Sequence, residues 1–111
     1  MFSLKRKNHY NINKYIIIIE IPIEVYKGRY FVDGEEVVSK RTGYRPLHDK
    51  RTYDGYKKVV LYSNGGTTYK EFLVHRLVYL AHNPDADISD KRINHKNGNI
   101  RDNRIENLEL G

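Results

Sequence analysis

The chain has 111 residues, which fits one domain and leaves little room for a second. It contains no cysteine, so disulfides, thiol catalysis and cysteine-ligated zinc are excluded. Twenty Lys and Arg against 14 Asp and Glu give a net charge of +6, which favours polyanionic partners such as nucleic acids. Apolar runs such as Ile16 to Ile19 are far shorter than the roughly 20 residues of a membrane span. We therefore expect a soluble, cytoplasmic protein with no membrane partner.

The N-terminal quarter of the chain divides into a polar and an apolar part. Residues 1–14 are basic and rich in Asn, so we expect a flexible arm, which either frays or contacts DNA. β-Branched residues dominate residues 15–26 and predict a strand. Pro22 cannot donate to a sheet, which places this part at an edge or before a bend. The four isoleucines at 16–19 either pack in the core or pair with a second protein chain.

Two hairpins are expected next. Asp33-Gly34 suits the positive φ angles of a type I′ turn and joins the first pair of strands. A Ser-Asn-Gly-Gly turn at 63–66 joins the second pair. Residues 15–72 are therefore predicted to form an antiparallel β module. The four strands are expected at 29–32, 35–39, 56–62 and 67–72.

The hydrophobic period changes at residue 73. Apolar residues recur at i, i+3, i+4 and i+7, which predicts a helix over 73–82 that ends at Asn83-Pro84. His75 and His82 lie on its other face, where a surface or packing role competes with a role as metal ligands. The apolar positions are Val74, Leu77, Val78 and Ala81.

The C-terminal segment is rich in Asn and turns. A short strand is expected at 92–95, followed by a turn at 96–99. Asn103 and Glu106 resemble the N-cap and N3 residues of a capping box, and a further strand is expected to begin at Leu108. Taken alone, this is either a loop whose Asn side chains satisfy the backbone or a site built around His95.

Three blocks of this region resemble the small phage HNH homing-type endonucleases. The blocks are Val74 to Val78, Ile93 to Asn99, and Asn103 to Leu108, against a family pattern of roughly V-H-R-L-V-A, D-H-x-D-G-N, N-N and N-L. The N-terminal β module is also similar, so the resemblance covers about residues 20–110. It implies an α+β fold in which the β module precedes a helix and a ββα-metal hairpin.

The resemblance also implies roles for individual residues. In this family the histidine at the end of the strand is the general base that activates water, and a neighbouring Asp and a helix residue hold one divalent metal ion. By position, His95 is the catalytic base, Asn94 stands at the metal ligand, and Asn107 is the hairpin-stabilising asparagine. The implied cofactor is one Mg²⁺ or Mn²⁺ ion.

Two features depart from the family pattern. Asn94 is a neutral amide where the family has an Asp. The chain ends at Gly111, before the helix that would carry the last metal ligand, so we expect a truncated motif and an incomplete metal site.

The basic residues are concentrated in two clusters. Residues 40–58 hold seven Lys and Arg against two Asp, with tyrosines between them, which favours either a solvated loop or a DNA-backbone contact. A second cluster surrounds His95, where cations suit a phosphodiester site. The predicted DNA-binding residues are Lys40, Arg41, Arg45, Lys50, Arg51, Lys57, Lys58, Arg76, Lys96, Arg101 and Arg104.

The sequence thus predicts an arm at 1–14, a β module at 15–72, and a helix with an HNH-like motif at 73–111. The functional hypothesis is a metal-dependent HNH DNA endonuclease, a phage protein acting in the host cytoplasm, that nicks or cleaves DNA. The alternatives are an inactive HNH-derived DNA-binding protein and a small phage factor that inhibits a host protein. The DNA target and the oligomeric state stay open.

Overall fold

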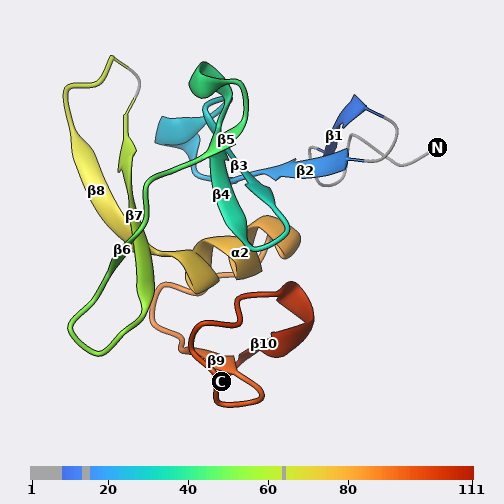
Figure 1. Cartoon of the computed structure of the whole chain (residues 1–111), viewed down its shortest axis with the longest axis vertical. Coiled ribbons are helices and arrows are strands. Elements are labelled where there is room, and N and C mark those ends of the chain that lie inside the picture. The colour runs from blue at the N-terminus through green and yellow to red at the C-terminus, as the bar shows by residue number, and fades with distance from the viewer. Residues whose placement is uncertain (1–8, 14–15, 64) are drawn as a thin grey trace.

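The strands form three antiparallel sheets around helix α2 (Val74–His82) (Figure 1). The structure is a computed structural model and describes residues 9–13, 16–63 and 65–111. The strand orders are β1-β2-β3-β4-β5, β6-β7-β8 and β10-β9. In Figure 1, α2 lies between the five-stranded sheet and the C-terminal hairpin. The predicted α+β class is confirmed. The strands are β1 His9–Asn13, β2 Ile16–Glu20, β3 Tyr30–Asp33, β4 Glu36–Ser39, β5 Arg45–Pro46, β6 Lys50–Arg51, β7 Lys57–Tyr62, β8 Tyr69–Leu73, β9 Ile93–His95 and β10 Leu108–Leu110.

Helix α2 organises the core. The four apolar positions predicted from the period are all buried, with exposures of 0 to 1%. Leu77 shares one apolar cluster with Val37 and Leu61 of the two larger sheets and with Ile93 and Leu108 of the C-terminal hairpin. The helix therefore fixes the C-terminal hairpin relative to the β module. Within the described residues, no helix has the length and apolarity needed to cross a membrane.

The N-terminal segments differ from the prediction in two ways. His9–Asn13 form β1 and pair with β2, so these residues are a strand rather than a flexible arm; residues 1–8 and 14 lie outside the described part. The strand predicted over 15–26 ends at Glu20, and a short 3₁₀ helix, η1 (Glu24–Tyr26), follows. Pro22 explains the break because it has no N–H to continue the ladder. Ile18 and Ile19 are buried in the same chain, which favours the core interpretation.

The β3–β4 turn lies one residue later than predicted. Asp33 pairs with Glu36, so the two central residues are Gly34 and Glu35. Gly34 has φ of +63°, whereas Glu35 is not among the described residues with positive φ. Positive φ at the first central residue alone matches a type II′ turn instead of type I′. The shift places Glu35 at the tip of the hairpin.

Candidate functional site

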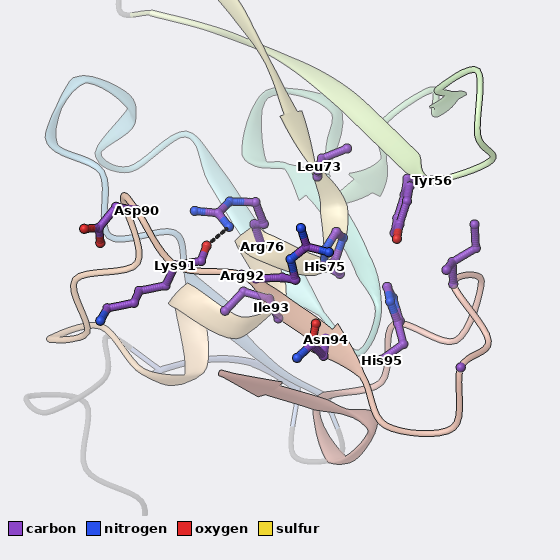
Figure 2. Close-up of a pocket in the computed structure, with 12 residues that line it drawn as sticks. Tyr56, Leu73, His75, Arg76, Asp90, Lys91, Arg92, Ile93, Asn94 and His95 are labelled. Atoms are coloured by element: carbon purple, nitrogen blue, oxygen red, sulfur yellow. Dashed lines mark hydrogen bonds between the residues drawn. The ribbon is translucent and has the colours of Figure 1, made fainter. Parts of the chain in front are cut away.

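His95 ends strand β9 and lines an open pocket of about 680 Å³. β9 pairs with β10, where His95 lies opposite Leu108, and the buried Ile93 and Leu108 anchor both strands on α2. Figure 2 shows the rings of Tyr56, His75 and His95 at one end of this pocket and the side chains of Asp90 and Lys91 at the other. The pocket is lined by Tyr56, Leu73, His75, Arg76, Asp90, Lys91, Arg92, Ile93, Asn94, His95, Gly98 and Ile100.

Asn103 fixes one ring nitrogen of His95. The His95 Nε2 atom lies 2.7 Å from the Asn103 Oδ1 atom, and Asn103 is only 2% exposed. An amide oxygen only accepts hydrogen bonds, so Nε2 carries the proton and Nδ1 is left with a free lone pair. The predicted capping box is wrong, because the Asn103 side chain contacts His95 and does not cap a helix. The 3₁₀ helix that follows, η3 (Ile105–Asn107), has Arg104 at its N-cap, with no side-chain cap hydrogen bond.

His75 packs directly against His95. The two ring centroids lie 4.7 Å apart, and Tyr56 stacks on His75 at 5.4 Å (Figure 2). Burial, and then the neighbouring His95 and Arg76, lower the pKa of His75 to about 4, so this ring is neutral at pH 7. The packing interpretation of His75 is the one that its burial supports. No sequence signal indicated that its partner is His95, because the two residues lie on different elements.

Asn107 contacts the turn that follows His95 with both ends of its side chain. Its Oδ1 atom accepts from the Asn97 N–H at 3.1 Å, and its Nδ2 atom donates to Asn97 Oδ1 at 3.0 Å and to the Asp102 carbonyl at 2.9 Å. The Lys96 N–H donates to the Asn107 carbonyl at 2.7 Å. Three of these hydrogen bonds thus tie η3 to the turn after β9, and the fourth ties it to Asp102.

We expect the Asn107→Ala variant to lose about 2 kcal/mol of unfolding free energy, because the partners of a buried amide would be left unsatisfied. Urea unfolding followed by circular dichroism measures the loss. Asn99→Ala is the matched control, since Asn99 is exposed on the same turn. Equal losses in the two variants would contradict the role given to Asn107.

The residues beside His95 do not form a metal site by themselves. Asn94 lines the pocket one residue before His95, but its side chain is a neutral amide. Among the described residues, no group of three or more His, Cys, Asp or Glu is arranged to hold a metal ion. Divalent ions such as Mg²⁺ prefer several oxygen ligands with at least one carboxylate. Asn94 could provide one ligand, and the described residues do not complete the set.

The structure separates the predicted DNA-binding residues into two groups. Some cations are held within the protein: Lys57 pairs with Glu36 and Asp49, Lys58 pairs with Glu71, and Arg76 donates to the Lys91 and Ile88 carbonyls. Arg104 binds Asp102 through two nitrogens and lowers the pKa of that carboxyl. The remaining residues are exposed: Lys40, Arg41, Arg45, Lys50, Arg51, Lys96 and Arg101. Lys91 and Arg92 add positive charge at the pocket itself.

Two comparisons with known proteins relate this chain to the HNH endonucleases. Residues 72–111 match the family model of the HNH endonucleases. The chain carries an HNH-type endonuclease segment. The structure of the HNH homing endonuclease I-HmuI, described as binding and cleaving DNA, matches with a TM-score of 0.63 and 31% identity. The match covers 78% of this chain and 48% of that one, so the chain spans about half the length of this HNH relative. A comparison with curated proteins gave no match.

The HNH segment, defined as residues 72–111, contains α2, β9, η3 and β10. It includes both histidines of the ring pair and both buried asparagines of the site. Tyr56 comes from the β module, so the pocket is formed by the HNH segment together with the preceding strands.

Proposed function

We propose that this protein is a DNA endonuclease that hydrolyses phosphodiester bonds, nicking one strand or cleaving both, with His95 as general base. The observation that carries the proposal is the placement of His95 at a strand end, in a pocket with basic residues, with one ring nitrogen bonded to a buried amide. The match to an HNH homing endonuclease supports the same reaction.

The residues of the pocket have separate tasks in this mechanism. Nδ1 of His95 takes a proton from water, and the water oxygen attacks the phosphorus while the bond to the leaving oxygen breaks. Asn103 keeps the other proton on Nε2, so Nδ1 stays available. Lys91 and Arg92 attract the phosphate and offset the charge that develops on it. Asn107 holds the turn that carries this arrangement.

The proposed cofactor is one Mg²⁺ or Mn²⁺ ion, because HNH endonucleases generally use a divalent metal ion. When bound, such an ion stabilises negative charge on the phosphate and the leaving oxygen. Asn94 is the candidate ligand, and the described residues offer no group of three or more His, Cys, Asp or Glu to join it. We expect weak metal binding for this reason.

The exposed cations of residues 40–51 and of the turn after His95 are proposed to contact the DNA backbone. Such contacts position a protein on DNA without reading its sequence. A second candidate function is DNA binding without cleavage. The neutral Asn94 favours it, because a site without a carboxylate retains a metal ion poorly.

A supercoiled-plasmid assay separates these functions. The protein is incubated with plasmid and Mg²⁺ or Mn²⁺, with a chelator as control, at about 50 and about 200 mM salt. The endonuclease proposal predicts nicked or linear product that requires the metal ion. It is rejected if neither ion supports product at high protein concentration. If the protein then slows the plasmid in the gel at the lower salt but not at the higher salt, it is a DNA-binding protein. If it slows the plasmid at neither salt concentration, the result favours a protein partner.

A further inference from the structure

The tip of the β3–β4 hairpin is held in a fixed position. β3 and β4 pair without interruption from Tyr30–Ser39 to Asp33–Glu36, and the side chains of Val37 and Val38 are buried. The two-residue turn leaves Glu35 little freedom, because the residues on either side of the turn, Asp33 and Glu36, pair with each other. In Figure 1 this hairpin extends to α2, with the C-terminal segment directly beyond it.

Glu35 contacts the HNH segment across 68 positions of sequence. Its Oε1 atom accepts a hydrogen bond from the backbone N–H of Asn103 at 3.0 Å. Asn103 is almost fully buried, so water has little access to that N–H. A charged acceptor makes a stronger hydrogen bond than a neutral one, and a buried N–H without an acceptor costs free energy. The carboxylate therefore fixes the backbone of Asn103.

The same residue carries the amide that holds His95. The atoms form a continuous chain from the Glu35 carboxylate to the Asn103 backbone, and from the Asn103 side chain to His95 Nε2. A shift of the Asn103 backbone moves its Oδ1 atom by a similar amount. A displacement of about 1 Å at a positioning group can cost about 100-fold in rate.

We propose that Glu35 is a positioning residue for His95, acting through Asn103. The β module thereby contributes to the geometry of the HNH site, although Glu35 itself does not line the pocket. The inference rests on the proposed function for its catalytic consequence. Its structural consequence, a single ring tautomer of His95, is independent of cleavage.

Three variants in one turn test this role. Glu35→Ala removes the acceptor, whereas Glu35→Gln keeps an acceptor oxygen of the same reach and removes the charge. Asp33→Ala is the matched control, because it removes an exposed carboxylate at the end of β3, two positions before Glu35. We expect Glu35→Ala to lower kcat for plasmid nicking about 10- to 100-fold with little change in KM. Glu35→Gln should recover most of this loss, and Asp33→Ala should match the wild type.

Nitrogen-15 spectra of the histidine side chains at pH 8 test the same chain of contacts without cleavage. The wild type should show His95 protonated at Nε2, and Glu35→Ala should show a mixture of the two tautomers, with Glu35→Gln restoring the first. If the wild type does not cut DNA but the tautomer shift occurs, the positioning role stands and only the catalytic proposal fails. An unchanged His95 spectrum in a folded Glu35→Ala protein overturns the positioning role. A loss of kcat in Glu35→Gln as large as that in Glu35→Ala overturns it as well.

Discussion

Replacing His95 by alanine is expected to lower metal-dependent plasmid nicking by about 10²- to 10⁴-fold, the usual contribution of a general base. The proposed mechanism places the proton acceptor on this ring alone, because Asn103 is engaged with its other nitrogen. His95→Ala removes none of the Lys and Arg residues proposed to contact the DNA backbone. Plasmid retention at low salt should therefore be unchanged.

His48→Ala is the matched control for this experiment. His48 is exposed between β5 and β6 and does not line the pocket of His95. The control should nick plasmid at the wild-type rate. Circular dichroism establishes that His95→Ala is folded, since the lost ring also packs on His75. Wild-type nicking by a folded His95→Ala protein would remove His95 from the proposed mechanism.

Local patterns were sufficient to predict the elements that carry the site. The 3.6-residue period placed α2 to within one residue, because the apolar positions that define the period are those that pack in the core. The strand ending at His95 and the strand beginning at Leu108 were also predicted at the observed positions. Sequence patterns over a few residues are sufficient for this helix and these strands, because each element depends on neighbours that are close in the sequence.

The contacts around His95 could not be predicted in the same way. Asn103 matched a local capping pattern, yet its side chain forms a hydrogen bond with His95 at the end of β9, and this tertiary contact replaces the local one. The predicted turn at Asp33-Gly34 was wrong by one residue because the pairing of Asp33 with Glu36 sets the turn. That single shift decides that Glu35 faces Asn103. Contacts across many residues depend on the packed fold and leave no spacing pattern in the sequence.

The stability of the fold is expected to fall by about 2–3 kcal/mol between pH 7.5 and pH 4.5 through His75 alone. Burial and the neighbouring His95 and Arg76 lower the pKa of His75 from 6.5 to about 4. The unfolded chain therefore binds a proton at His75 below about pH 6.5, whereas the folded protein does not until about pH 4. Within this window the unfolded state binds more protons, so stability decreases as the pH falls.

Urea unfolding of the wild type and of His75→Gln at a series of pH values isolates this contribution. Glutamine does not titrate, so the difference in unfolding free energy between the two proteins should shrink by about 2–3 kcal/mol from pH 7.5 to pH 4.5. His48→Gln serves as the control, because it makes the same substitution at an exposed histidine. Carboxyl groups such as Asp102 titrate alike in all three proteins and cancel in the difference. Parallel pH curves for the wild type and His75→Gln would mean that His75 accepts a proton in the folded protein, and that the ring pair with His95 tolerates a charge.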